Sequence, residues 1–489
     1  PSRGLGDVYK RQVPDLPTID TSTEQDVAGG GYNHWATAGF FGRLNYNYKE
    51  KYLLEVNGRY DGTSRFMKDQ RWNFFPSFSL GWNVARENFW KPLESVVNQF
   101  KLRGSWGELG NQNTSNLYPF YEILPVKSNS GNWLVNGGKT NTADIPSLVS
   151  TLLTWERVRS FNVGFDFGAF SNRLTGSFDY FVRKTVDMVG PAPQLPLVLG
   201  IAPAIVNNAD MKSYGFEIEL SWRDRIGEVD YGVKFNLADA QQKVVKYPNT
   251  TNAFSDWYAG KMSGEIWGYT SLGIAKTDEE MKEHLASLPN GGQNQLGNKW
   301  GAGDIMYADI NGDGKVDGGK GTLADPGDQR IIGNSTPRYN FGLVLDASYK
   351  GFDVSIFFQG VGKRDYAPIV GTNGAVFWGA VNNIWQSMAM EEHFDYFRPE
   401  GHPMGANLNG YYPRPDFTSN KNHQVQTRYL QDASYIRLKN LQIGYTLPKQ
   451  WINKLQINRC RVYVSGDNLW TGTSLASICL LYTSDAADD

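Results

Sequence analysis

Hydrophobic and polar side chains alternate strictly along Phe40–Asp61, and a short charged turn at Lys49–Lys51 divides this stretch into two halves. A period of two indicates β-strands with one apolar face and one polar face. Each half runs to about ten residues, the length that a tilted strand needs to cross a bilayer, whereas globular strands usually have about five or six. Tyrosines lie near the ends of the apolar face, as in the aromatic girdles of membrane barrels. A single hairpin of this kind also fits a soluble β-sandwich. Whether the pattern recurs along the chain therefore distinguishes a membrane barrel from a sandwich.

The same alternation recurs through the chain and predicts about a dozen strands, most of them in neighbouring pairs. In the first hairpin it predicts that one set of side chains faces lipid (Leu44, Tyr46, Leu54, Val56) and the other faces a lumen (Arg43, Asn45, Glu55, Asn57). Further alternating stretches cover residues 77–84, 101–106, 161–167, 174–182, 214–223, 231–237, 341–349, 352–358, 435–445 and 460–465.

The connections between these stretches alternate between short and long. The short ones span 49–51, 171–173, 223–228 and 349–351, with longer members of the same kind at 88–99 and 448–459. The long ones span 62–73, 107–159, 184–212, 238–338 and 360–432. Loops of such length are rare in compact soluble domains, whereas outer-membrane barrels have short periplasmic turns and long extracellular loops on opposite rims. The pattern therefore predicts an all-β fold, an antiparallel transmembrane β-barrel present in part.

Composition agrees with a barrel and excludes other classes. The net charge of −2 and the pI of about 6.3 do not favour a nucleic-acid partner. Aromatic residues make up 14% of the chain and glycine contributes 53 residues, which suits girdles, twisted strands and turns. Mean hydropathy is −0.46, and no apolar run approaches the roughly 20 residues of a membrane helix.

The two ends of the chain carry a shared signature that is unrelated to folding. Asp7–Gln12 back-translates to GATGTGTATAAGAGACAG, whose reverse complement, read one frame over, encodes the Cys-Leu-Leu-Tyr-Thr-Ser of Cys479–Ser484. This inverted element resembles the transposase end of a sequencing-library adapter. We therefore expect residues 1–12 and 479–489 to be adapter-like segments. Residues 13–478 are then expected to hold a partial receptor barrel that lacks its plug and closing strands.

Several motifs resemble the SusC/RagA family of TonB-dependent outer-membrane transporters. They follow one another in the family's order and cover nearly all of residues 13–470. The motifs are YDGTSRF at Tyr60–Phe66, WNFFPSFSLGW at Trp72–Trp82, LRGSWGELGNQN at Leu102–Asn113, LTWER at Leu153–Arg157, NRLTGSFDYFVRKT at Asn172–Thr185, GFEIEL at Gly215–Leu220, DASYIRLKNLQIGYTLP at Asp432–Pro448 and SGDNLW at Ser465–Trp470.

This resemblance implies a place, a role and partners. The resemblance implies a barrel of about 22 strands around a plug, in the outer membrane of Gram-negative bacteria. The implied role is import of a bulky nutrient, commonly an oligosaccharide and sometimes a peptide. The implied partners are the TonB–ExbB–ExbD complex, a SusD-like surface lipoprotein and outer-membrane lipid. The contrasting hypothesis is a secreted, β-rich glycan-binding module with no membrane contact.

One stretch has the spacing of a calcium loop. Asp309, Asn311, Asp313 and Asp317 place oxygen donors at alternate positions, with Gly314 at the sharp turn and the Lys315 carbonyl as a further donor. The twelfth position, which should be acidic, is Lys320; an insertion at Gly318–Gly327 displaces the acid to Asp328. Close carboxylates repel one another unless a cation neutralises them, so we predict a structural Ca²⁺ ion here. A solvated acidic turn is the alternative.

Other candidate sites carry little chemistry. Glu217 and Glu219 lie two positions apart on one strand face. In a barrel this face lines the lumen, where water hydrates charged side chains, so the two carboxylates do not indicate a glycosidase pair. The three histidines of the last long loop have no metal-ligand spacing, and no nucleotide or hydrolase motif occurs. The sequence therefore predicts neither an enzyme nor an organic cofactor. Five loop tryptophans suit either stacking on sugar rings or burial within folded loops: Trp133, Trp257, Trp267, Trp378 and Trp385.

Overall fold

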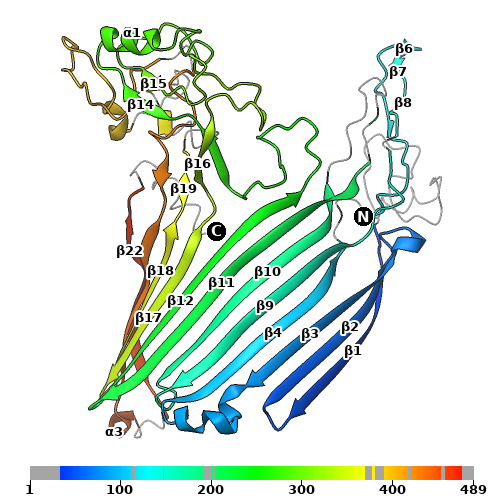
Figure 1. Ribbon diagram of the computed structural model, residues 1–489, viewed down its shortest axis with the longest axis vertical. Helices are drawn as coiled ribbons and strands as arrows, with labels where there is room; N and C mark the ends of the chain where they lie inside the picture. Colours follow the sequence, from blue (N-terminus) through cyan, green and yellow to red (C-terminus); the bar gives the residue numbers. More distant parts are fainter. Residues whose placement is uncertain are drawn as a thin grey trace, which may run out of the picture.

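The computed structural model describes residues 33–112, 114, 117–146, 148–190, 201, 204–368, 377–379, 390–416, 420–452 and 457–475. Both adapter-like ends lie outside these ranges. Twelve strands form one curved antiparallel sheet in which neighbours in space follow one another along the chain (Figure 1). They are β1 (Thr37–Tyr48), β2 (Tyr52–Thr63), β3 (Trp72–Asn83), β4 (Val97–Asn111), β9 (Glu156–Ala169), β10 (Leu174–Gly190), β11 (Val206–Ile226), β12 (Val229–Lys246), β17 (Arg338–Tyr349), β18 (Phe352–Lys363), β21 (Tyr435–Thr446) and β22 (Arg461–Thr473).

The sheet is open. Among the described residues, β1 pairs only with β2 and β22 pairs only with β21, so each outer strand has one free edge. This matches the predicted partial barrel, because a barrel removes its edges only when the sheet closes on itself.

The register of the first hairpin confirms the predicted faces. Leu44 lies opposite Val56, and Arg43 lies opposite Asn57, so each face keeps its character across the two strands. The Arg43 Nε donates to Asn57 Oδ1 at 2.7 Å on the polar face. Lys49 and Glu50 both have positive φ, as a two-residue turn that follows the twist of the strands requires.

Two rows of stacked aromatic rings run across the apolar face. Trp72 stacks on Phe40 and Tyr60, and Tyr52 stacks on Tyr48 and Trp82. Phe40 and Tyr48 are eight positions apart on β1, or about 27 Å along the strand. A tilt of roughly 40° reduces this to roughly 21 Å of height, close to the ~25 Å apolar band of an outer-membrane barrel.

The three longest strands extend well beyond the alternation that predicts them. β10, β11 and β12 have 17, 21 and 18 residues, and their pairing continues into stretches that the sequence assigned to long loops. Beyond the bilayer both faces of a strand meet water, so apolar alternation is no longer required and the strand ends cannot be read from it.

The long connections contain further elements, all at one end of the sheet (Figure 1). The helices in the described ranges are too short or too polar to cross a bilayer. The additional strands are β5 (Val126–Lys127), β6 (Leu134–Val135), β7 (Gly138–Lys139), β8 (Thr142–Ala143), β13 (Glu265–Gly268), β14 (Ser271–Ile274), β15 (Ile305–Tyr307), β16 (Arg330–Asn334), β19 (Asp365–Tyr366) and β20 (Gln431–Asp432). The helices of the long connections are η3 (Lys68–Gln70), α1 (Asp278–Ala286) and η7 (Glu391–Phe394). Three further helices lie in the shorter connections: η4 (Val84–Arg86), η5 (Asn88–Leu93) and α3 (Lys449–Ile452), of which α3 is at the opposite end of the sheet (Figure 1).

Candidate functional site

The two longest connections fold together into one body above the sheet, which we call the loop module. It comprises residues 247–337, between β12 and β17, and the described part of 364–434, between β18 and β21 (Figure 1). The two connections meet at a parallel bridge between Tyr269 and Gln426, where the Tyr269 N–H donates to Val425 O at 2.8 Å.

The module has a hydrophobic core of its own, drawn from both connections. Its fully buried members include Ile305, Tyr307 and Tyr429, which are 0% exposed. Partly buried apolar side chains pack around this core from both connections. Among the described residues, buried apolar side chains form one larger cluster, and all of its members lie in the module: Tyr269, Leu288, Ile305, Tyr307, Val316, Phe377, Trp378, Tyr412 and Tyr429.

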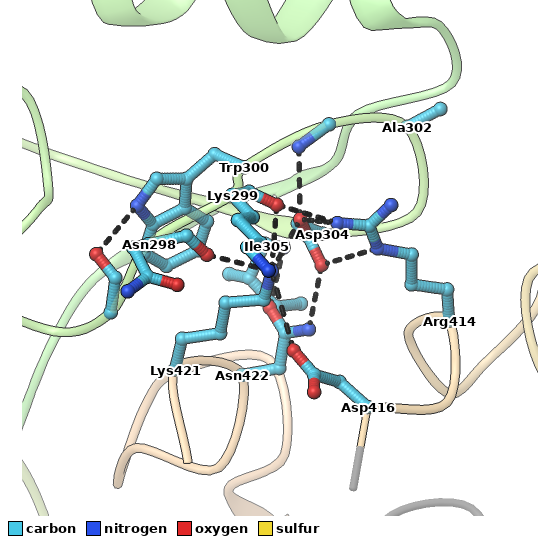
Figure 2. Close-up of polar contacts among 12 residues, drawn as sticks. Asn298, Lys299, Trp300, Ala302, Asp304, Ile305, Arg414, Asp416, Lys421 and Asn422 are labelled. Carbon is cyan, nitrogen blue, oxygen red and sulfur yellow. Dashed lines mark hydrogen bonds and ion pairs between the residues drawn. The ribbon is translucent and has the colours of Figure 1, made fainter. Parts of the chain in front are cut away.

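A buried carboxylate joins the two connections beside this core. Figure 2 shows Asp304 surrounded by Arg414, Lys421 and Asn422, which come from the other connection. Asp304 accepts from Arg414 Nε at 2.9 Å and Nη2 at 2.6 Å, from Lys421 Nζ at 2.9 Å and from Asn422 Nδ2 at 3.0 Å. The Gly301 N–H adds a further donor at 2.9 Å. A fully buried charge is tolerated only with such complete pairing.

Backbone carbonyl and carboxylate oxygens surround the buried Lys421 ammonium group. It is 1% exposed and donates to the carbonyls of Asn298 at 3.3 Å and Lys299 at 3.1 Å. It also lies 3.4 Å from an Asp416 carboxylate oxygen and 5.1 Å from the centre of the Trp300 ring. We call Asp304, Arg414, Lys421 and Asn422 the Asp304 hub. The sequence did not reveal it, because Asp304 is 110 or more positions from the other three members and the four residues form no motif.

Burial changes the protonation of a histidine in the module. His423 stacks on Trp378 with ring centroids 4.3 Å apart. Burial lowers the pKa of His423 to about 4, against a smaller opposing effect of Asp416. The ring is therefore neutral at physiological pH, and charging it opposes folding of the module.

The residues of the predicted calcium loop lie together at one side of the module. Asp309 accepts from the N–H groups of Gly312 at 2.6 Å and Gly314 at 2.8 Å. The fully buried Asp328 folds back across the insertion and accepts from the N–H groups of Ile310 and Asp317 at 2.7 and 2.8 Å. The Asp313 carboxylate accepts from the Lys315 N–H at 3.2 Å, and Asn311 Oδ1 accepts from the Asp313 N–H at 3.0 Å.

The donor set is of the right type for calcium, but it already has a cation. The Lys315 ammonium contacts the Asp317 carboxylate and lies 3.8 Å from Asp313. This contact lowers the pKa of the Asp317 carboxyl. Within the described ranges, no three His, Cys, Asp or Glu side chains are grouped so that they could hold a metal ion. The Ca²⁺ ion stays a prediction, and Lys315 is an alternative source of neutralising charge.

Some of the loop tryptophans are buried within the folded loops and others are exposed, as stacking on a sugar ring would require. Trp378 is buried in the module core, and Trp267 stacks on Phe254 with centroids 4.6 Å apart. Trp133 and Trp257 are exposed and accessible to a ligand. Trp385 lies outside the described residues.

Three of the recognisable motifs meet at the rim of the sheet. Phe66 of YDGTSRF packs with Phe75, Leu153 and Trp155 in a second, smaller buried cluster. The Trp155 Nε1 donates to Arg71 O at 2.8 Å, and Arg71 Nε donates to Phe66 O at 3.0 Å. These motifs therefore brace the connection between β2 and β3 against the strand that enters β9.

The polar face of the sheet is lined by paired charges and uncharged hydrogen-bonding groups. Arg103 donates to Asp166 and Asp179, both at 2.8 Å, and Arg159 donates to Glu108 at 2.7 Å. A hollow of about 470 Å³ lies on this face. Hydroxyl and amide side chains line much of it, beside Glu55, Lys101 and Arg103: Asn45, Asn47, Ser79, Ser105 and Asn162.

Comparison with known families and proteins identifies relatives of this chain. The family described as "TonB dependent receptor-like, beta-barrel" matches residues 3–469. "TonB-dependent receptor P3" of Formosa agariphila is 30% identical over 451 residues, which are 88% of this chain and 41% of that protein. "TonB-dependent receptor SusC" of Bacteroides thetaiotaomicron is 25% identical over 427 residues, 84% of this chain and 38% of that protein.

Solved structures agree with the fold. The chain superposes on the structure titled "Structure of the RagAB peptide transporter" with a TM-score of 0.71 at 21% identity, covering 95% of this chain and 47% of that one. A related structure, titled as a peptide importer in the "closed-closed" state, gives a TM-score of 0.67 at 20% identity. The chain thus spans less than half the length of the relatives that it matches.

Proposed function

The chain belongs to the TonB-dependent receptor-like β-barrel family of the outer membrane, and from this premise we propose that it forms half of the wall of an active importer. The proposed cargo is a bulky, hydroxyl-rich nutrient, an oligosaccharide. One observation carries the proposal: a twelve-stranded sheet with an apolar outer face, a polar inner face and all of its long loops on one rim.

The apolar face argues against the secreted glycan-binding module. Leu44, Leu80 and Val464 on this face are exposed, and in the described part of the chain no second sheet packs over them. A soluble sandwich buries such a face against a second sheet about 10 Å away. A bilayer supplies the missing apolar contact instead.

The inner face supports an uncharged, hydrogen-bonding cargo. The row across the sheet carries amides and hydroxyls beside one carboxylate: Asn45, Glu55, Ser79, Ser105 and Asn162. The nearby Arg103 is neutralised by two aspartates. Cargo must bind a conduit weakly at several sites if it is to pass through, which favours such groups over unpaired charges. The exposed Trp133 and Trp257 offer faces on which sugar rings stack.

The partners form part of the same proposal. Energy would come from the inner-membrane proton gradient through TonB–ExbB–ExbD, and a SusD-like surface lipoprotein would sit over the long loops. A peptide is the second candidate cargo, because the structures with TM-scores of 0.71 and 0.67 are titled as a peptide transporter and a peptide importer. The relatives found are named as receptors or transporters, and we propose no catalytic activity.

Uptake assays with the intact protein test this proposal. A strain that lacks the gene is offered fluorescent oligosaccharides and peptides, with and without the restored gene. We expect oligosaccharide uptake that needs both the gene and TonB. Uptake of peptides alone would replace the cargo class, and uptake that survives the loss of TonB would overturn active import.

A further inference from the structure

A row of cationic side chains crosses the outer, apolar face of the sheet toward its loop end. Lys184 of β10 lies directly opposite Arg159 of β9 on one side and Lys212 of β11 on the other. Lys212 in turn lies directly opposite Lys243 of β12. Side chains two positions apart on a strand share a face, so Lys212 lies on the same face as Tyr214, and its partners in the row lie there too.

Three of these cations have no counter-ion in the part of the chain that the structure describes. Arg159 Nε lies 2.7 Å from a Glu108 carboxylate oxygen. Lys184, Lys212 and Lys243, which we call the lysine row, form no ion pair with any described residue. Two of them are exposed and Lys212 is half-buried. Like charges directly opposite each other, with Cβ atoms about 4.5–5.5 Å apart, destabilise a sheet, so the row favours an anion that lies across it.

The acids beside the lysine row do not neutralise it. Two carboxylates lie within three positions of the row along its strands, those of Asp187 and Asp210. Asp187 accepts from Arg157 Nη2 at 2.9 Å. Asp210 accepts from the Asp187 N–H at 3.0 Å and lies opposite Lys246. Each acid therefore has a partner outside the row, and the lysine row keeps its positive charge.

The lysine row lies just beyond the outer edge of the apolar band. On β11, Trp222 and Tyr214 are eight positions apart on the apolar face. Phe40 and Tyr48, which mark the two aromatic rows on β1, have the same spacing. Lys212 is the next side chain on this face toward the loop end, and its Nζ lies 5.2 Å from the centre of the Tyr214 ring (Figure 1). The row is therefore at the level of the lipid headgroups of the outer leaflet.

Position and charge together define the ligand. A lysine ammonium group binds phosphate oxygens through charge-assisted hydrogen bonds. The next side chains on the same face, toward the middle of the bilayer, are Phe161, Val182 and Tyr214, and they offer apolar contact to acyl chains. Free phosphate would match the charge of the row but not this apolar surface. A lipid with a phosphate-bearing headgroup matches both.

We infer that the lysine row is a binding site for the phosphate groups of a lipid in the outer leaflet. The acyl chains of this lipid lie along the apolar face of β9, β10 and β11. The inference concerns the lipid-facing side of the sheet, so it holds for any cargo that passes along the polar side. Free phosphate is the competing ligand, and the test separates it from the lipid.

Binding of labelled lipid A to the intact protein tests the inference. The full-length protein, purified in a non-ionic detergent, is titrated with fluorescent lipid A that carries two phosphates and with its dephosphorylated form. We expect the phosphorylated form to bind at least tenfold more tightly, and its affinity to fall as salt screens the charges. Equal affinity for both forms would overturn the phosphate site. Inorganic phosphate that displaces the lipid at equal concentration would overturn the lipid as ligand.

Substitutions in the lysine row give a second readout. K184Q/K212Q/K243Q removes three charges and is expected to weaken binding of phosphorylated lipid A at least tenfold. K184R/K212R/K243R keeps the charges, and guanidinium groups also bind phosphate, so its affinity should stay within about threefold of the unsubstituted protein. Loss of binding in the arginine variant would overturn recognition by charge.

A matched control removes three cations from the other face of the same strands. R183Q/R223Q/K234Q takes one exposed cation each from β10, β11 and β12, all on the polar face, and should change lipid A affinity less than twofold. Heat-modifiable gel mobility reports the barrel assembly of every variant. Equal losses of binding in this control and in the glutamine variant would overturn the lysine row as the site. The comparison of the two lipid forms uses the unsubstituted protein, so it tests the inference even if a variant fails to assemble.

Discussion

The loop module and the described residues 118–146 and 148–152 between β4 and β9, the outer hairpin segment, rise from the same rim of the sheet, yet the first buries its apolar side chains and the second exposes them. The module buries aromatic and aliphatic side chains and closes around the Asp304 hub. The segment leaves most of its apolar side chains in water. The module draws on two long connections, whereas the segment has about 35 residues, below the size at which a chain usually encloses a core unaided. In this protein, a long loop buries its apolar side chains where a second long loop packs against it.

The largest effect is expected when the hub that unites the module is broken. Asp304→Ala leaves the Lys421 ammonium and the Arg414 guanidinium buried without their main counter-ion, which we expect to cost about 3–5 kcal/mol. Hydrogen exchange of the intact protein in detergent should rise in both connections, including residues 420–431. Lys315→Ala, which removes a half-exposed ammonium group, should have a much smaller effect. Exchange confined to the neighbourhood of residue 304 would mean that the two connections fold independently.

The outer face of the sheet offers a third apolar surface, one that lipid covers. Arginine at Leu54 should cost about 2–4 kcal/mol of barrel stability, whereas arginine at Asn57, on the polar face, should cost little. Heat-modifiable mobility of the two variants in the intact protein measures the difference. Equal assembly of both would contradict the assigned faces.

Acid should weaken the module and spare the segment. The unfolded pKa of His423 is near 6.5 and its folded pKa is about 4, so the unfolded state binds more protons between these values. The stability contributed by the neutral ring is fully present above about pH 6.5 and falls by about 3 kcal/mol as the pH drops to about 4. Proteolysis of the module across this range should follow that curve. The variant His423→Asn should flatten it, and an unchanged curve would remove His423 as the cause.

Calcium should have a smaller effect, confined to one side of the module. If an ion binds at Asp309 and Asp313, calcium at tenfold its dissociation constant adds about 1.4 kcal/mol. Chelator should then raise cleavage between residues 308 and 332, and D309A/D313A should abolish the difference. A cleavage pattern that ignores both chelator and calcium would leave Lys315 as the cation that neutralises this loop.

The smallest effect is expected in the outer hairpin segment. Leu134→Ser changes a side chain that is already exposed, so the stability of the isolated transporter should change by less than about 0.5 kcal/mol. The same substitution in the module core, Ile305→Ser, should unfold the module. A large loss of stability from Leu134→Ser would show that the segment has a core that its exposure conceals.

The amino-acid sequence by itself determined the twelve-stranded sheet of this protein. Strand existence, pairing order and the two faces follow from alternation, because a bilayer on one side and water on the other force a period of two on each spanning strand. The register in which Leu44 meets Val56 and Arg43 meets Asn57 is one result. The aromatic rows at Trp72 and Tyr52 are another.

Only the tertiary structure decided what the long loops do. Asp304 and Lys421 are 117 positions apart, and nothing in the local pattern of either residue indicates the other. The strand ends beyond the bilayer, as in β11, were also hidden, because water on both faces removes the alternation. Burial of Trp378 and exposure of Trp133 depend on which segments meet in space. Contacts of this kind come from long-range packing, which local periodicity does not encode.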